Sequence, residues 1–343
     1  MTEPDRPLVR ESFVLSAPGP NEVTVRVVGC GVCHTDIGFL HGGVRTNHAL
    51  PLALGHEISG EVVEAGEGAE TWLNKPVVVP AVLPCGECDF CHAGRENACR
   101  KQMMPGNDFH GGFGSHITMP AKWLVDASNL PEELSFADVS VLADAISTPY
   151  QAAVRANVQS GDTVIVIGSG GIGSFGIQIA AAMGANVIAI DIDDAKLERA
   201  MKYGAKGTLN TRRMESGVAR KAVKAKVKEL DLPPFGHKVL EMSGTPVGQE
   251  LAWSLLSFAG VVGIVGFCLD RIPIRLSNLM AFDADAFGNW GCRPQLYTPA
   301  LDLVREGKIQ ILPFVRHFPM DSINDVLQDV QAHKISERPI LLP

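Results

Sequence analysis

The sequence predicts an α/β fold with two domains, one rich in β-strands and one doubly wound around a parallel sheet. Two observations predict it. Residues 22–145 are typical of short strands and turns, whereas from about Thr148 short apolar runs alternate with helical segments. Such alternation is typical of a parallel sheet covered by helices. A chain of 343 residues is also long enough for two cores.

The first domain is predicted from β-branched runs that end at glycine or proline. Residues 22–31 (EVTVRVVGCG) and 57–66 (EISGEVVEAG) are such runs, and the prolines of 75–86 suit strand ends and loops. Towards the end of the chain, residues 297–309 and 322–334 are each predicted to form a helix, the second with Ser322 as its N-cap. We assign residues 1–147 and 289–343 to this domain.

The second domain is predicted from four short apolar runs of the kind that parallel sheets bury: 162–168, 186–191, 238–244 and 260–267. Helical segments at 174–184 and 194–204 separate the first of them. We assign residues 148–288 to this domain.

Composition excludes several classes of function. With 46% hydrophobic and 20% charged residues, the chain is typical of a globular protein, and its net charge of −8 argues against a nucleic-acid partner. The first residues have no apolar core and are not expected to be a secretory signal. Thr163 to Ile190 contains no charged residue, but its glycines divide it into strand, turn and helix, so no membrane span is expected. Eight cysteines favour a reducing compartment, which we take to be the cytoplasm.

The most specific motif is a group of four cysteines within residues 85–99. Two overlapping C-x-x-C steps and a fourth cysteine form the spacing of a closed zinc site, with ligands Cys85, Cys88, Cys91 and Cys99. Four thiolates leave no open coordination position, so we expect this zinc to be structural.

A glycine-rich turn predicts a dinucleotide site. Gly168, Gly170 and Gly173 form G-x-G-x-x-G, with Gly171 in the same turn, after a strand and before a helix. The helix N-terminus would bind the pyrophosphate, and Asp191 at the end of the next strand would accept hydrogen bonds from a ribose. Because this carboxylate would repel a 2′-phosphate and no arginine follows it closely, NAD is favoured over NADP. A glycine turn without a ligand is the alternative.

Candidate ligands of a second metal lie outside the cysteine group. Cys33 lies in GCGVCHTD, and His56 and Glu57 lie in LALGHEISG. Alone, Cys33 or His56 would be an ordinary core residue. The neighbouring cysteine group and the dinucleotide motif make a catalytic zinc with one open position the better hypothesis.

With these motifs, nearly the whole chain resembles the zinc-dependent, medium-chain alcohol dehydrogenases. The resemblance implies a GroES-like catalytic domain with a structural zinc lobe at about residues 85–99, and a Rossmann NAD-binding domain. It implies NAD and two Zn²⁺ per subunit as cofactors. It also implies that Cys33 and His56 hold the active zinc, that Glu57 lies behind the metal or exchanges onto it, and that DAISTPY supplies the third ligand.

The same resemblance assigns further residues. Thr148 resembles the residue that touches the nicotinamide end, Lys196 the lysine near the adenosine ribose, and Arg338 the arginine that contacts pyrophosphate. His34 is expected to contact a phosphate. The cofactor-binding set is therefore His34, Thr148, Gly168, Gly170, Gly171, Gly173, Asp191, Lys196 and Arg338.

Two positions depart from the family pattern. Asp144 replaces the usual cysteine, and a carboxylate ligand would make the zinc more Lewis acidic or more loosely held. Alternatively, Asp144 binds a nearby N–H group and is not a ligand. Thr35 matches the hydroxyl residue beside the reacting oxygen, but Gly38 stands where many relatives have a relay histidine, so His34 or His41 is a candidate substitute.

The expected reaction is hydride transfer between an alcohol carbon and NAD, with zinc lowering the pKa of the alcohol and Thr35 moving its proton. The catalytic set is thus Thr35, Cys33, His56, Glu57 and Asp144. Free polyols or sugars are alternative substrates. A zinc-free quinone reductase is disfavoured by Cys33 and His56, and a non-enzymatic zinc-binding NAD sensor is the alternative of another class.

Two segments suggest a substrate. GVRTNHALPLALGHEISG and MPGND resemble one branch of the family, the 6-hydroxycyclohex-1-ene-1-carbonyl-CoA dehydrogenases of anaerobic aromatic degradation, which implies a 6-oxo product. A basic run is compatible with binding of coenzyme A phosphates, although such a run is usually a solvated face; its members are Arg212, Arg213, Arg220, Lys221, Lys224, Lys226 and Lys228. The relatives' assembly implies a homo-oligomer, a dimer or tetramer.

Overall fold

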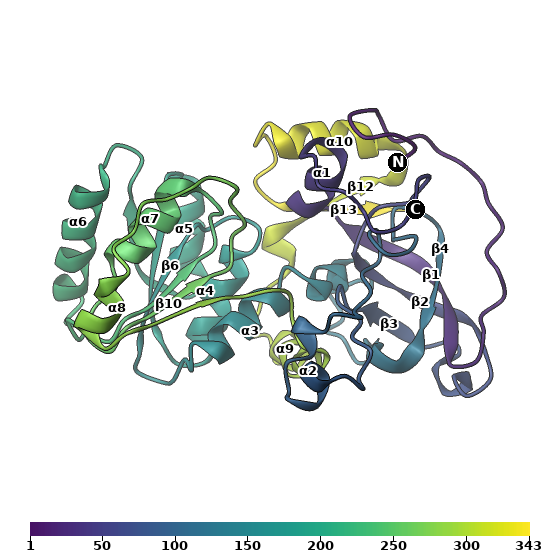
Figure 1. Cartoon of the computed structure of the whole chain (residues 1–343), viewed down its shortest axis with the longest axis horizontal. Coiled ribbons are helices and arrows are strands. Elements are labelled where there is room, and N and C mark those ends of the chain that lie inside the picture. Colours follow the sequence, from purple (N-terminus) through teal and green to yellow (C-terminus); the bar gives the residue numbers. More distant parts are fainter. The chain divides into compact units, whose positions relative to one another are not determined.

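The computed structural model describes residues Met1–Pro343, which divide into two compact units (Figure 1). The first unit comprises Met1–Ser147, Gly291–Gly307 and Ile311–Pro343, and the second comprises Thr148–Trp290 and Lys308–Gln310. Residues 289–290 and 308–310 were assigned by sequence to the first domain but lie in the second unit. Hydrogen bonds explain this, because Asn289 N–H donates to the Ile264 carbonyl (2.8 Å) and Gln310 N–H donates to Gln178 Oε1 (2.8 Å).

A seven-stranded sheet forms the first unit. Its strand order is β12-β13-β1-β2-β3-β5, with β4 also paired to β1. The strands are β1 (Glu22–Gly31), β2 (Glu57–Ala65), β3 (Pro76–Val79), β4 (His116–Pro120), β5 (Val125–Asp126), β12 (Val315–Pro319) and β13 (Arg338–Leu342). All these pairs are antiparallel except β12 with β13. Because β13 pairs with β1, the end of the chain lies beside its first strand.

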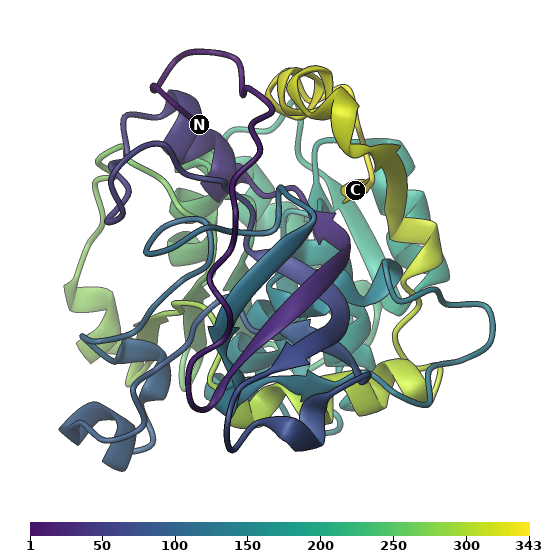
Figure 2. The same ribbon diagram turned by 90° about the vertical axis from the view of Figure 1, so that its right-hand side faces the viewer.

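The helices of the first unit are short. They are α1 (His34–His41), α2 (Asp89–His92), α9 (Tyr297–Arg305) and α10 (Ile323–Gln331), with 3-10 turns that include η4 (Asp138–Ala143). The segment before β1 runs in extended form along the outside of this unit in both views (Figures 1 and 2). Ser322 is the N-cap residue of α10, as predicted, although its hydroxyl donates to the Pro319 carbonyl and accepts no helix N–H.

The core of the first unit follows from the alternation of β1. Val23, Val25 and Val27 are buried on one face and pack with Ile58 and Val62 of β2. In a strand, alternate side chains share a face, so these β-branched residues form one continuous apolar layer. The layer holds the ends of β1 and β2, where the candidate metal ligands lie.

The second unit is a six-stranded parallel sheet in the order β11-β10-β9-β6-β7-β8. Its strands are β6 (Thr163–Ile167), β7 (Asn186–Asp191), β8 (Ala205–Asn210), β9 (Lys238–Glu241), β10 (Val261–Ile264) and β11 (Asp285–Gly288). The helices are α3 (Ser147–Arg155), α4 (Gly173–Ala182), α5 (Asp194–Lys202), α6 (Ser216–Glu229), α7 (Pro246–Ser254) and α8 (Ser277–Phe282). The strand order reverses between β6 and β9, which is where doubly wound folds bind ligands.

One face of this parallel sheet is covered by α6 and α7. Ala219, Val223 and Val227 of α6 pack with Leu251 of α7 over isoleucines of β6 and β7. The opposite face of α6 carries Arg220, Lys224 and Lys228, which are all exposed. No helix of the protein has both the length and the apolar character that a membrane crossing requires.

Candidate active site and dinucleotide site

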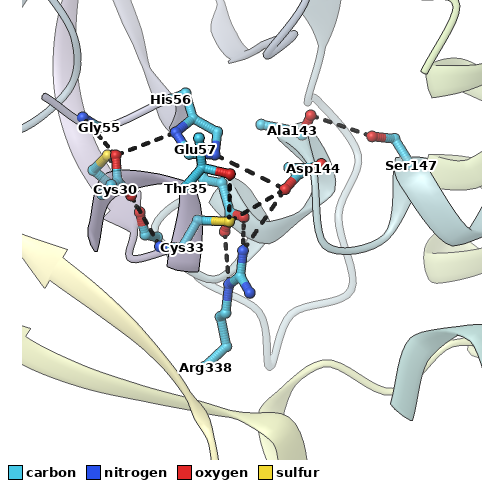
Figure 3. Close-up of polar contacts among 12 residues, drawn as sticks. Cys30, Cys33, Thr35, Gly55, His56, Glu57, Ala143, Asp144, Ser147 and Arg338 are labelled. Atoms are coloured by element: carbon cyan, nitrogen blue, oxygen red, sulfur yellow. Dashed lines mark hydrogen bonds and ion pairs between the residues drawn. The ribbon is translucent and has the colours of Figure 1, made fainter. Parts of the chain in front are cut away.

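The first unit brings four potential metal ligands together at the ends of its strands. Cys33 precedes α1, His56 and Glu57 lie at the start of β2, and Asp144 follows η4. One ligand atom from each lies within 4.8 Å of all the others. The Asp144 carboxylate is 3.6 Å from Cys33 Sγ and 3.9 Å from His56 Nε2 (Figure 3).

Asp36 positions two of these ligands from behind. Its carboxylate accepts hydrogen bonds from the N–H groups of Cys33 (2.9 Å) and Gly55 (3.2 Å) and lies 3.3 Å from His56 Nδ1. The imidazole is therefore held with Nε2 towards Asp144. A carboxylate on the second ring nitrogen is the usual way in which a metal-binding histidine is oriented.

Glu57 and Arg338 form a buried ion pair beside the ligands. Arg338 Nε donates to Glu57 Oε2 at 3.0 Å, its Nη2 contacts Oε1, and the guanidinium is 3.8 Å from Asp144. Glu57 is 0% exposed and Arg338 is 6% exposed. Glycine at position 31 makes the arrangement possible, because a Cβ there would lie 2.2 Å from Glu57 Oε2. The predicted pyrophosphate contact of Arg338 stays a prediction.

Burial and neighbouring charges act in opposite directions on the pKa of Glu57 and on that of His56. Burial raises the pKa of Glu57 to about 7, against the opposing effect of Arg338. Burial would lower the pKa of His56, but the carboxylates of Asp36 and Asp144 outweigh it and raise that pKa well above its usual value. Thiol, imidazole and carboxylate groups thus crowd around one point with a single buried cation behind them. This sulfur, nitrogen and oxygen donor set fits zinc.

The proton-transfer candidates lie on α1. Thr35 Oγ1 is 3.6 Å from Cys33 Sγ, which places the hydroxyl beside the ligand group. A Cβ on Gly38 would meet only the Val44 side chain, at 3.7 Å. His41 lies at the far end of α1, with Nδ1 3.3 Å from Asp5, while the His34 ring stacks on His333 with centroids 6.1 Å apart. Both histidines therefore have contacts of their own, and neither is seen bonded to Thr35.

The cysteine group forms a four-sulfur cage. Neighbouring sulfurs are 3.5–3.9 Å apart. Disulfide sulfurs would be about 2.05 Å apart, whereas a tetrahedron with Zn–S bonds of about 2.3 Å has edges of about 3.8 Å. The backbone N–H of Glu87 is the main reason why the pKa of Cys85 falls to about 6, and N–H groups of Gly86 and Lys101 donate to Cys91 and Cys99. Burial raises the pKa of Cys91 to about 12, so the N–H groups favour a thiolate at Cys85 but not at Cys91, while the sulfur spacing of the whole cage fits zinc.

The second unit has the geometry of a dinucleotide site. Gly168 ends β6 with φ +90°, and a Cβ on Gly173 would lie 1.7 Å from the Gly168 carbonyl oxygen. A Cβ on Gly170 would meet nothing within 4 Å, so that side of the turn is open to a ligand. Gly171 lies in the same turn, just before α4. A close turn followed by a helix N-terminus fits a pyrophosphate.

Asp191 connects this turn to the end of β7. Its Oδ2 accepts the N–H of Ser169 at 2.6 Å, and its Oδ1 accepts those of Ile192 (2.7 Å) and Asp193 (3.0 Å). Lys196 lies on the adjacent helix α5. Thr148, at the first residue of the second unit, accepts a hydrogen bond at its carbonyl from the Asn289 side chain (3.2 Å).

Known proteins share both halves of this architecture. Residues 19–131 match the family model for the alcohol dehydrogenase GroES-like domain, and residues 171–306 match the model for zinc-binding dehydrogenases. An alcohol dehydrogenase of Geobacillus stearothermophilus is 31% identical over 323 residues, which cover 93% of this chain and 91% of the relative. The chain belongs to the zinc-binding alcohol dehydrogenases.

Other members of the zinc-binding alcohol dehydrogenases have different names. The D-arabinose 1-dehydrogenase (NADP(+)) of Saccharolobus solfataricus is 28% identical and covers 98% of this chain and 95% of its own. The crystal structure of galactitol-1-phosphate dehydrogenase from Escherichia coli superposes with a TM-score of 0.88 at 26% identity, covering 99% of this chain and 98% of that one. The predicted fold class and the enzyme class are thereby confirmed.

Sequence reasoning placed Arg212 of this alcohol dehydrogenase in the basic run and missed its position at the end of β7. Arg212 lies beside the end of β7, where its Nε donates to the Ile192 carbonyl at 2.7 Å. The reason is the parallel pairing of β7 with β8, which brings the residues after both strands to the same edge. The signal was the basic pair 212–213, but β8 was not among the predicted strands, and only the strand order reveals which strand end the pair adjoins.

Proposed function

We propose that this alcohol dehydrogenase transfers hydride between a nicotinamide dinucleotide, preferably NAD, and a secondary alcohol or its ketone. The observation that carries the proposal is the convergence of Cys33, His56 and Asp144 around one point, beside the Thr35 hydroxyl. Cys33, His56 and Asp144 would hold a zinc ion, with Glu57 as the neighbouring or exchanging ligand. Cys85, Cys88, Cys91 and Cys99 would hold a second, structural zinc.

The protein's own groups prepare the site for proton and hydride transfer. When bound, zinc supplies a Lewis acid that makes an alcohol easier to deprotonate. Asp36 fixes the His56 ring, and Arg338 balances the charge of Glu57 so that two carboxylates and a thiolate coexist in a buried site. Thr35 Oγ would take the alcohol proton in oxidation while its own hydroxyl proton passes to solvent, and the reverse exchange would return a proton in reduction.

The dinucleotide is assigned to the second unit. The turn at Gly168, Gly170, Gly171 and Gly173 and the N-terminus of α4 would bind the pyrophosphate. Asp191 and Lys196 would bind the adenosine ribose, Thr148 would face the nicotinamide end, and His34 and Arg338 would approach the phosphates. The Asp191 carboxylate favours NAD because it repels a 2′-phosphate.

The decisive test removes ligands one at a time. Cys33→Ser and His56→Ala should each lose bound zinc from one of two sites per subunit and lose NAD-linked turnover by at least about a hundredfold. His92→Ala is a matched control, because this exposed histidine lies outside the ligand group. Full NAD-linked activity in a metal-free variant would contradict the zinc mechanism.

The substrate proposal is a ring alcohol carried as a CoA ester, 6-hydroxycyclohex-1-ene-1-carbonyl-CoA. It is supported by the segments at 43–60 and 104–108, which hydrogen-bond to each other through Asn47, Asn107 and Asp108. The exposed basic face of α6 is compatible with the coenzyme A phosphates. Lys224→Glu with Lys228→Glu should raise KM for the CoA ester and leave KM for NAD unchanged, whereas Lys202→Glu on α5 should change neither.

A polyol or sugar is the second substrate candidate. The relatives named D-arabinose 1-dehydrogenase and galactitol-1-phosphate dehydrogenase favour it. A spectrophotometric NADH screen that compares free cyclic alcohols and polyols with hydroxyacyl-CoA esters separates the two classes. Tight NAD binding without turnover of any of them would instead favour an NAD sensor.

We also propose that the protein is a homo-oligomer assembled through the second unit. The edge strand β11 is exposed, and four large apolar side chains near it are more than half exposed: Phe267, Leu269, Leu276 and Met280. An open edge beside apolar surface is a site for pairing with another chain. The eight free cysteines agree with a reducing compartment, which we take to be the cytoplasm.

A further inference from the structure

The proposed adenosine end of the dinucleotide site contains a cation, Arg212, that forms no ion pair with Asp191, the carboxylate proposed to bind the ribose. Arg212 is exposed, and its Nε donates to the carbonyl of Ile192, the residue next to Asp191. Its two terminal nitrogens form no ion pair with a carboxylate, although Asp191, Asp193 and Asp194 all lie between the end of β7 and the start of α5. The guanidinium therefore keeps both terminal donors for a ligand.

Asn210 fixes the position of Arg212. Its side-chain oxygen accepts the N–H of Arg212 at 2.9 Å, and its Nδ2 donates to Asp194 (2.5 Å) and to the Ile192 carbonyl (3.3 Å). The Thr211 N–H donates to the Asp191 carbonyl at 3.0 Å. The end of β8 is thus tied to the loop after β7 by backbone and side chain, and the Nε bond holds the guanidinium at Ile192, the residue next to Asp191.

Asp191 is meanwhile engaged by the backbone. Three N–H groups already donate to its carboxylate, two of them from Ile192 and Asp193 and one from Ser169 in the glycine turn. These donors stabilise its negative charge and leave little room for rearrangement. A phosphate on the 2′-oxygen of the ribose would meet this fixed anion on one side and the guanidinium of Arg212 on the other.

We propose that Arg212 is a coenzyme-specificity residue that gives this dehydrogenase a working affinity for NADP in addition to NAD. The proposal rests on the assignment of the dinucleotide site in the proposed function. A guanidinium binds phosphate through paired, charge-assisted hydrogen bonds and remains charged at every accessible pH. Repulsion from Asp191 keeps NAD the preferred coenzyme, whereas Arg212 offsets that repulsion enough for NADP to bind.

Binding of two small nucleotides tests this without turnover. 2′,5′-ADP and 5′-AMP differ only in the 2′-phosphate, and each can be titrated by calorimetry against the zinc-loaded protein. We expect Arg212→Gln to weaken 2′,5′-ADP binding by about tenfold and to leave 5′-AMP binding within about twofold. Arg213→Gln is the matched control, because it removes the same charge from the adjacent exposed residue, which makes no contact with Ile192.

The outcomes separate this inference from the proposed function. An equal loss of 2′,5′-ADP affinity in Arg212→Gln and Arg213→Gln would mean that Arg212 acts only through net charge, and would overturn the inference. Unchanged 2′,5′-ADP binding in Arg212→Gln would overturn it as well. Steady-state kinetics give the second readout: kcat/KM should fall about tenfold for NADP and remain unchanged for NAD. Absence of turnover with either coenzyme would contradict the proposed function, while the nucleotide titrations would still decide on Arg212.

Discussion

At the scale of single residues, Asp144 is the proposed zinc ligand that substitution tests most directly. Its carboxylate lies 3.6 Å from Cys33 Sγ and 3.9 Å from His56 Nε2, close enough for the three side chains to share one metal ion. The alternative, that Asp144 serves only as an acceptor for a nearby N–H, does not require it to approach both other ligands.

Substitution of Asp144 should therefore change metal retention. Asp144→Cys should keep two zinc ions per subunit, because a thiolate is also a good zinc ligand. Asp144→Asn should lose zinc from one site, with at least about tenfold weaker retention, because a neutral amide is a poor donor. Zinc per subunit after dialysis against a weak chelator measures this. Equal zinc content in Asp144→Asn and wild type would show that Asp144 is no ligand.

His237 predicts an acid-sensitive contribution to stability in the second unit. Burial lowers its pKa in the folded state, as does Lys224, while its Nε2 donates to the Pro233 carbonyl at 2.9 Å. The unfolded pKa is about 6.5. Stability from this residue is thus complete above pH 6.5 and falls as the pH drops below it, because the unfolded state binds the proton first.

His237→Gln keeps a donor towards Pro233 and removes the titration. Urea unfolding at pH 7.5 and 5.5 should show a smaller loss of unfolding free energy in this variant than in wild type, by up to about 1.4 kcal/mol for each unit of pKa difference. Identical losses in both proteins would contradict the assignment.

At the scale of elements, the glycine turn between β6 and α4 meets two separate requirements: close backbone packing at Gly173 and space for a ligand at Gly170. Gly173→Ala should destabilise the fold by about 1–3 kcal/mol, because its Cβ would lie 1.7 Å from the Gly168 oxygen. Gly170→Ala meets no protein atom within 4 Å, so it should fold normally and bind NADH more weakly. Thermal unfolding and NADH fluorescence titration distinguish the two, and Gly217→Ala, at an open helical position, should lower neither stability nor NADH affinity.

The cysteine lobe is expected to depend on its four-sulfur site for a fixed conformation. Cys99→Ser should remove one zinc per subunit and expose residues 85–101 to limited proteolysis, because a structural site contributes its binding free energy to folding. Lys101→Ala, next to the cage but with only its backbone N–H on Cys99, should leave zinc content unchanged. A Cys99→Ser protein with two zinc ions would contradict the four-sulfur site.

The sequence was most informative for elements with strong local signals. Val164 to Ile167 and the glycines after them specify a strand and a close turn by composition alone, and the cysteine spacing specifies its own cage. Arg338 could not be placed in this way. Its contact with Glu57 depends on the pairing of β13 with β1, which no local pattern encodes.

At the scale of the whole molecule, the open edge of the six-stranded sheet makes oligomerisation testable. Asp285 and Asn289 donate their N–H groups to β10, so by alternation the N–H of Ala286 points to the open edge. Ala286→Pro removes this outward donor and should turn the oligomer into monomers at about 10 µM, whereas Ala286→Val keeps it. Light scattering gives the mass. A monomeric wild type would contradict the proposal.

The buried pair of Glu57 and Arg338 has a consequence for biosynthesis. The two residues are 281 positions apart, and β13 carries Arg338 near the end of the chain. On the ribosome, Cys33, His56, Glu57 and Asp144 emerge long before the guanidinium that balances them. Until β13 pairs with β1, these groups lack their buried cation and their final positions. We therefore expect metal insertion at the proposed active site to follow release of the finished polypeptide, and loading of the cysteine lobe, whose ligands are local in sequence, to be possible during translation.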